Sequence, residues 1–138
     1  MCGVPVSVVA RSDTSPRRSA MPTVFHRAPR LWYLGLQQYF DAVISSEEVE
    51  KSKPEPDVFL AAAEKLHTMP ENCLVVEDSA FGIEAGLRAG MQVMAVPYIT
   101  DAPLDEIFSK SDILFPQGQT EFTAEKAMVW FNDRYLQE

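Results

Sequence analysis

Hydrophobic residues from position 39 onward fall into short apolar runs separated by longer stretches of mixed character. Each run is rich in β-branched or other apolar residues, which is typical of buried strands. The runs are AVIS (42–45), CLVVE (73–77), QVMAV (92–96) and DILF (112–115). This pattern predicts a strand at each of these places.

The stretches between the runs carry the spacing of helices. Residues 57–67 place Phe59, Leu60, Ala63 and Leu66 on one side of a helix. The prolines just before this stretch are compatible with a helix start, because the first N–H groups of a helix have no partner within it.

Two further helices are expected later in the chain. One covers residues 81–89 and should end at Gly90, because glycine readily adopts the left-handed conformation that closes a helix. The other covers residues 124–136, and its apolar side is expected to consist of Met128, Val129, Trp130 and Phe131. Strands that alternate with helices at this spacing favour right-handed βαβ crossovers. We therefore predict an α/β fold with a mainly parallel sheet flanked by helices.

Charge divides the chain at about residue 38. Residues 1–38 contain five arginines and one aspartate, a net charge of +4, and the remainder carries -12, which together give the total of -8. The first part, with its prolines and paired arginines, is predicted to be an irregular segment with one strand at residues 4–10. Residues 39–138 are predicted to form the core domain.

The composition also excludes several classes of protein. A net charge of -8 argues against non-specific nucleic-acid binding, which needs a basic surface. No apolar run approaches the roughly 20 residues of a membrane span, so no membrane association is expected. The two cysteines, Cys2 and Cys73, do not form a disulfide framework, which favours a cytoplasmic protein.

Two polar clusters fall where chemistry is expected in such a fold. Lys53 lies in a loop just before a helix, whereas Glu77 and Asp78 end a buried strand and Ser79 leads into the next helix. Ligands of open parallel sheets bind beyond the carboxyl ends of the strands. An aspartate there suits Mg²⁺, and a lysine suits a phosphoryl group. The combination fits phosphoryl transfer, which depends mainly on positioning and charge neutralisation.

Each cluster has a plain structural explanation as well. A lone lysine on a loop is usually a solvated surface charge. Asp78 or Ser79 can cap the following helix by accepting hydrogen bonds from its first N–H groups. The two clusters together, in this order and spacing, favour a chemical role over either explanation alone.

The segments YFDAV, KPEPDVF and EDSAFGIEAGLRAG resemble the haloacid dehalogenase (HAD) superfamily, in the branch that holds β-phosphoglucomutase and sugar-phosphate phosphatases. The resemblance runs without a gap through residues 39–97 and more loosely to the end of the chain. It implies a Rossmann-like, HAD-type fold. It also implies a Mg²⁺-dependent phosphatase or phosphomutase that acts on a small phosphorylated metabolite, within that class a sugar phosphate.

The resemblance implies a role for individual residues. Lys53 matches the family's third-motif lysine, which steadies the nucleophilic carboxylate and the transferring phosphoryl oxygens. Asp78 matches the fourth-motif acid that coordinates Mg²⁺, and Glu77 supports the same ion. Gly82 and Gly86 match the start of the next helix, where structural roles are expected.

The earlier motifs of the family are matched poorly or not at all. Ser12 is the candidate for the second-motif hydroxyl that binds phosphate, with Thr14 or Ser15 as alternatives. The first motif, Asp-x-Asp, normally supplies the nucleophile and the general acid–base, and no Asp-x-Asp occurs in this chain. There is also no room for a helical cap domain before residue 4. We therefore expect a truncated or frame-disrupted product with an incomplete core, no cap domain and little or no turnover.

Two alternatives remain beside the enzyme. The loss of the family's first strand should expose a strand edge, so the chain could be a non-catalytic remnant or interaction protein that needs a partner, or it could self-associate through that edge. A phospho-acceptor receiver domain also uses acids, Mg²⁺ and a lysine at strand ends. Its acids come early and its lysine late, however, whereas Lys53 precedes Glu77 and Asp78 here.

Overall fold

The computed structural model of the chain describes residues 6–7, 9–11, 40–98, 101 and 103–135. Its strands are β1 (Val6–Ser7), β2 (Val9–Arg11), β3 (Ile44–Ser45), β4 (Cys73–Glu77), β5 (Gln92–Ala95) and β6 (Ile113–Leu114). Its α-helices are α2 (Asp57–Lys65), α3 (Ala80–Arg88) and α4 (Ala124–Tyr135). Short 3-10 helices are η3 (Ser46–Glu48), η4 (Pro70–Asn72), η5 (Glu106–Lys110) and η6 (Gly118–Thr120).

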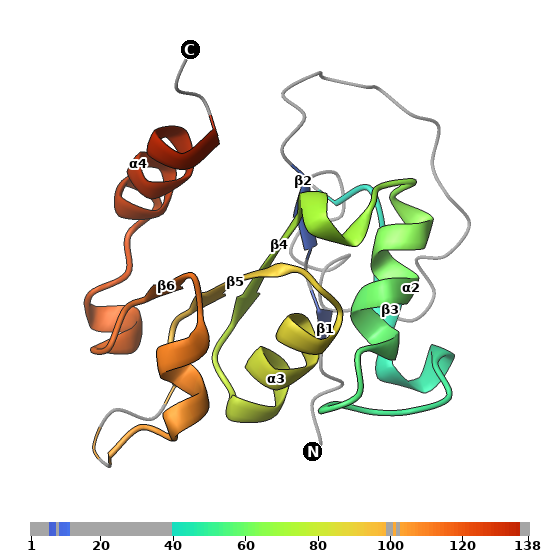
Figure 1. The fold of residues 1–138 in the computed structure, drawn as a ribbon, viewed down its shortest axis with the longest axis horizontal. Coiled ribbons are helices and arrows are strands. Elements are labelled where there is room, and N and C mark those ends of the chain that lie inside the picture. Colours follow the sequence, from blue (N-terminus) through green and yellow to red (C-terminus); the bar gives the residue numbers. More distant parts are fainter. Residues whose placement is uncertain (1–5, 8, 12–39, 99–100, 102, 136–138) are drawn as a thin grey trace, which may run out of the picture.

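The main sheet has the strand order β2-β4-β5-β6 (Figure 1). Strands β4, β5 and β6 are parallel to one another, and β2 runs antiparallel to β4. Because α3 connects β4 to the parallel β5, these elements form the expected βαβ unit. The predicted α/β, Rossmann-like fold with a mainly parallel sheet is confirmed.

The first three residues of β4 are paired with β2. Val9, Ala10 and Arg11 lie opposite Val75, Leu74 and Cys73, respectively. Nearby, β1 pairs antiparallel with β3 in a separate two-stranded sheet. β2 therefore supplies backbone partners for Cys73, Leu74 and Val75 of β4. The expectation that the loss of the family's first strand exposes a strand edge stays a prediction.

The N-terminal predictions can be compared with the structure only in part. Within the strand predicted at 4–10, Val6 and Ser7 form β1, and Val9 and Ala10 belong to β2. Residues 12–39, which contain most of the predicted irregular segment, lie outside the described residues. The division of the chain at residue 38 therefore stays a prediction.

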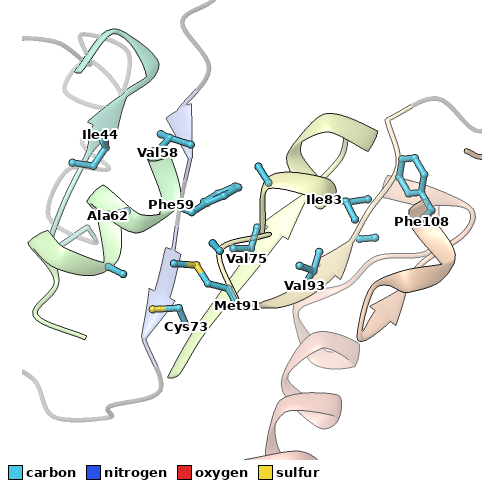
Figure 2. Close-up of a cluster of buried hydrophobic side chains, with 14 residues drawn as sticks. Ile44, Val58, Phe59, Ala62, Cys73, Val75, Ile83, Met91, Val93 and Phe108 are labelled. Carbon is cyan, nitrogen blue, oxygen red and sulfur yellow. The ribbon is translucent and has the colours of Figure 1, made fainter. Parts of the chain in front are cut away.

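One face of the sheet packs against α2, α3 and η5 (Figure 2). Val75 of β4 and Val93 of β5 are fully buried there, together with Phe59 of α2 and Ile83 of α3. Removing such apolar side chains from water is the main favourable contribution to folding. This face therefore contains the principal hydrophobic core of the described residues.

The buried side of α2 differs from the predicted one. Val58, Phe59, Ala62 and Ala63 face the core, whereas Leu60 is 39% exposed. Successive helical residues are about 100° apart, so a helix that buries positions 58 and 59 turns position 60 away from the sheet. The inclusion of Leu60 in the apolar side was wrong.

The opposite face of the sheet packs against α4, which lies apart from α2 and α3 (Figure 1). Trp130 and Phe131 of α4 pack against this face, but Met128 and Val129 are 54% and 59% exposed. Only half of the apolar side predicted for this helix therefore contacts the sheet. Arg134 fastens the helix further through an ion pair with Asp112 at 3.2 Å.

Two local predictions are confirmed. Gly90 follows α3 with φ = 73°, the left-handed conformation expected at the end of this helix. Cys73 is 2% exposed and packs in the core. Burial raises the pKa of its thiol, and the negative charge of Glu71 raises it further.

No helix among the described residues is both long and apolar enough to cross a lipid bilayer.

Candidate active site

An ion pair joins the two polar clusters that are 24 residues apart in the sequence. The amine of Lys53 contacts the carboxylate Oε1 of Glu77, the last residue of β4. The side chains are 19% and 8% exposed, so the pair is largely removed from water. The Lys53 amine also lies 4.9 Å from the centre of the Phe59 ring, within the range of a cation–π interaction. The structure thus brings Lys53 to the carboxyl end of β4.

The second oxygen of Glu77 is held by the start of α3. The hydroxyl of Ser79 donates to Oε2 of Glu77 at 3.2 Å, and Ser79 Oγ accepts from the N–H of Gly82 at 3.2 Å. Ser79 is therefore the N-cap of α3, as its structural explanation predicted. The same hydroxyl also orients Glu77, and so links the helix cap to the ion pair.

Gly82 leaves the space in which the Glu77 carboxylate lies. A Cβ atom at position 82 would be 1.9 Å from Oε2 of Glu77 and 2.1 Å from its Cδ. These separations are far below any van der Waals contact, so a side chain at 82 is incompatible with this position of Glu77. Gly82 was expected to have a structural role, and that role is to leave room for the Glu77 carboxylate that contacts Lys53.

The loop that carries Lys53 is fixed at two points. The backbone N–H of Lys51 donates to the carboxylate of Asp57, the first residue of α2, at 3.2 Å. Glu55 forms an ion pair with Arg88 of α3 at 2.9 Å. Because both contacts join the loop to helices of the core, they limit the positions that the Lys53 backbone can take.

Asp78 lies next to the ion pair but has different surroundings. Its side chain is exposed, and it lines a cavity of about 500 Å³ together with Ser79. The N–H of Tyr98 donates to the backbone carbonyl of Asp78 at 3.3 Å, which holds the segment after β5 against the segment after β4. Asp78 therefore presents its carboxylate at the carboxyl end of the parallel strands, where ligands of such sheets bind.

The donor set at this end of the sheet is compatible with Mg²⁺. The structure places the carboxylates of Glu77 and Asp78 on consecutive residues, and Mg²⁺ is commonly held by one or two carboxylates together with waters and substrate phosphates. Among the described residues there is no group of three or more His, Cys, Asp or Glu that could hold a metal ion. Glu77 is occupied by Lys53 and Ser79, which leaves Asp78 as the more open ligand.

Some features of this site were found by sequence reasoning and others were not. Ser12, the candidate phosphate-binding hydroxyl, lies outside the described residues, as do Thr14 and Ser15. The pairing of Lys53 with Glu77 was not predicted, because Glu77 had been assigned to the ion alone. The cavity beside Asp78 was not predicted either, because no local sequence pattern indicates that the segments after β4 and β5 together enclose a cavity. The contact between Ser79 and Gly82 was indicated by the sequence, because a serine just before a helix commonly caps its first N–H groups.

The chain belongs to the haloacid dehalogenase-like hydrolase family. The sequence model of that family matches residues 28–96, which is half of the chain. This match covers Lys53, Glu77 and Asp78.

Relatives and solved structures agree with this assignment. The chain is 39% identical over 95 residues to a bifunctional riboflavin kinase/FMN phosphatase of Arabidopsis thaliana, covering 69% of this chain and 23% of the relative. It is 46% identical over 66 residues to the fructose-1-phosphate phosphatase YqaB of Escherichia coli, covering 48% of this chain and 35% of the relative. The chain thus spans about a quarter to a third of these relatives.

The fold is also similar to that of a β-phosphoglucomutase from Clostridium difficile. The two structures superpose with a TM-score of 0.60 and 25% identity, over 78% of this chain and 45% of the other. The similarity extends over most of the chain and less than half of the larger protein.

Proposed function

We propose that this chain carries part of a Mg²⁺-dependent phosphoryl-transfer site, of the phosphatase or phosphomutase type, for a small phosphorylated metabolite. The observation that carries the proposal is the Lys53–Glu77 ion pair at the carboxyl end of β4, directly beside the exposed Asp78. The Lys53 amine and the exposed Asp78 carboxylate are thus both available to a ligand at one end of the parallel strands. The family of the chain supports the same reaction class.

Each residue has a distinct proposed role. Lys53 contributes a positive charge for the phosphoryl oxygens, and Glu77 holds its amine at the end of β4. Asp78 is the proposed ligand of Mg²⁺, with Glu77 as a secondary support. When bound, the ion would neutralise charge on the phosphoryl group. Ser12 remains the proposed phosphate-binding hydroxyl on sequence grounds.

We further propose that this chain alone turns over little or no substrate. The family's nucleophile comes from an Asp-x-Asp motif, and the sequence contains none. Without a nucleophile, the charges at Lys53 and Asp78 have no covalent step to assist, because the members of a catalytic set act as a unit.

Sugar phosphates are the first substrate class to test. One curated relative is a fructose-1-phosphate phosphatase, and another is described as a phosphatase of phosphorylated carbohydrates, from Thermotoga maritima. These names belong to proteins of which the chain covers about a third. A cytoplasmic setting, favoured by the few cysteines, is part of the same proposal.

Binding measurements test this proposal without depending on turnover. Mg²⁺ should shift the amide NMR signals of residues 77–80, and inorganic phosphate should shift the signals around Lys53 only when Mg²⁺ is present. Asp78→Asn should abolish the Mg²⁺ response, and Lys53→Ala should weaken the phosphate response alone. Asp133→Asn, an exposed aspartate on α4, is the matched control and should change neither. A Mg²⁺ response that survives Asp78→Asn would contradict the proposed site.

The missing nucleophile also favours a second candidate function, a non-catalytic interaction protein. Such a protein would need a partner, or a second copy, at a free strand edge. In the described sheet the terminal strands are β2 and β6, because β4 is paired on both sides. Sedimentation velocity over a hundredfold range of concentration separates the two candidates. A concentration-independent monomer that binds Mg²⁺ and phosphate supports the first, and a dimer that binds neither supports the second.

A further inference from the structure

The cavity beside Asp78 is formed by three segments, one that follows β4 and two that follow β5. The start of α3 contributes Ala80 and Phe81, the segment after β5 contributes Tyr98, and the η5 region contributes the remaining wall. That wall consists of Pro103, Leu104, Asp105 and Phe108. The cavity has a volume of about 500 Å³, which falls within the range usual for small-molecule sites. Most of the side chains that line the cavity are therefore apolar, and the proposed metal ligand Asp78 lies at its edge.

Two aromatic rings border this cavity without being buried. Phe81 is 64% exposed and Tyr98 is 73% exposed. Phe108, by contrast, is buried and belongs to the same core cluster as Ile83 (Figure 2), so it forms a fixed apolar floor. Exposed aromatic rings grouped around a concave apolar surface are typical of binding sites.

The charges in the cavity restrict what can enter it. Asp78 and Asp105 are both acidic, and none of the described residues lining the cavity is Lys, Arg or His. Asp105 is partly engaged, because its Oδ1 accepts the N–H of Ile107 at 2.9 Å. A phosphate dianion inside the cavity would be repelled by two carboxylates, whereas an uncharged group would not. The phosphoryl group therefore belongs at the Lys53 side of Asp78.

We infer that this cavity is a subsite for an uncharged aromatic ring attached to the phosphate, so that the ligand class is an aryl phosphate monoester. The inference rests on the proposed function, since the phosphoryl group is placed by Lys53 and Asp78. Phe81 and Tyr98 contact the ring from the rim and Phe108 lies beneath it. Aromatic rings pair favourably with one another in offset or edge-to-face arrangements.

Phenyl phosphate, glucose 1-phosphate and inorganic phosphate provide a direct comparison. Their affinities for the full chain are measured by NMR titration with saturating Mg²⁺. Phenyl phosphate should bind about tenfold more tightly than inorganic phosphate and also more tightly than glucose 1-phosphate. Phenyl phosphate should also shift the backbone amide signals of residues 104–108.

Variants at the rim test the rings individually. Phe81→Ala and Tyr98→Ala should each weaken phenyl phosphate binding by roughly three- to tenfold and leave inorganic phosphate unchanged. Both side chains are exposed, so their truncation opens no cavity in the core. Met69→Ala removes another exposed apolar side chain that does not line the cavity, and it should have no effect.

The outcomes separate this inference from the function on which it rests. Equal binding of the three ligands, or a preference for glucose 1-phosphate, would overturn the aryl subsite while leaving the proposed phosphoryl site intact. A phenyl phosphate preference that survives both rim variants would also overturn it. If no phosphate binds with Mg²⁺, the proposed function is rejected and the subsite with it.

Discussion

Replacing Gly82 by alanine should displace the carboxylate of Glu77 and release Lys53. The new Cβ would lie 1.9 Å from Oε2 of Glu77, so the carboxylate must move before the methyl group fits. Overfilling a packed site costs about 1–3 kcal/mol. Alanine in place of glycine inside a helix contributes about 1 kcal/mol in the opposite direction. The free energy of unfolding should therefore fall by roughly 0–2 kcal/mol.

A double-mutant cycle separates these two contributions. Glu77→Ala removes the carboxylate that the methyl group would strike. In that background, Gly82→Ala should be neutral or should raise the free energy of unfolding by up to about 1 kcal/mol, because only the helix propensity remains. The two substitutions should thus show an interaction energy of about 1–3 kcal/mol.

Urea unfolding followed by far-UV circular dichroism provides the four free energies of the cycle. Gly90→Ala is a useful comparison, since a Cβ there meets nothing within 4 Å and only the positive φ opposes it. Its effect should be the same with and without Glu77. The reasoning is refuted if Gly82→Ala is equally destabilising in both backgrounds, because the clash would then not involve Glu77.

Three further predictions concern Lys53, Ser79 and Cys73. Lys53→Met keeps the apolar stem but leaves the buried Glu77 carboxylate without its cation, so the free energy of unfolding should fall by about 1–3 kcal/mol in urea titrations. Lys51→Met, at an exposed lysine two residues away, should change it by less than about 0.5 kcal/mol, and an equal loss would contradict the role of the ion pair. Ser79→Ala removes the N-cap of α3 and should cost about 1 kcal/mol, with Ser79→Thr restoring most of it; no loss would mean that the cap is not formed. For Cys73, the folded-state pKa is raised from its ordinary value of 9.0. The contribution of the Cys73 thiol to the free energy of unfolding should therefore be complete below pH 9.0, and it should decrease as the pH rises through the folded-state pKa. Alkylation of Cys73 at pH 8, measured by mass spectrometry, should be much slower in the folded chain than in urea, and equal rates would refute its burial.

Local pattern was a reliable guide to the elements between positions 42 and 135. The run CLVVE corresponds to β4 residue for residue, and the helix predicted at 57–67 is α2, Asp57–Lys65. Strand alternation, helical spacing and the conformational freedom of Gly90 act over a few residues, so the sequence contains them directly. The choice of buried side was less reliable. Leu60 and Val129 are apolar and helical but exposed, because burial depends on what packs against a helix.

The sequence by itself determined the α/β class, the order of the elements and the residue types that favour phosphoryl chemistry. Only the tertiary structure decided that Lys53 contacts Glu77, that Gly82 leaves room for the Glu77 carboxylate, and that Phe81 and Tyr98 border one cavity. The physical reason is distance along the chain. Backbone conformation is set by near neighbours, whereas an ion pair across 24 residues forms only after the sheet and its helices have packed.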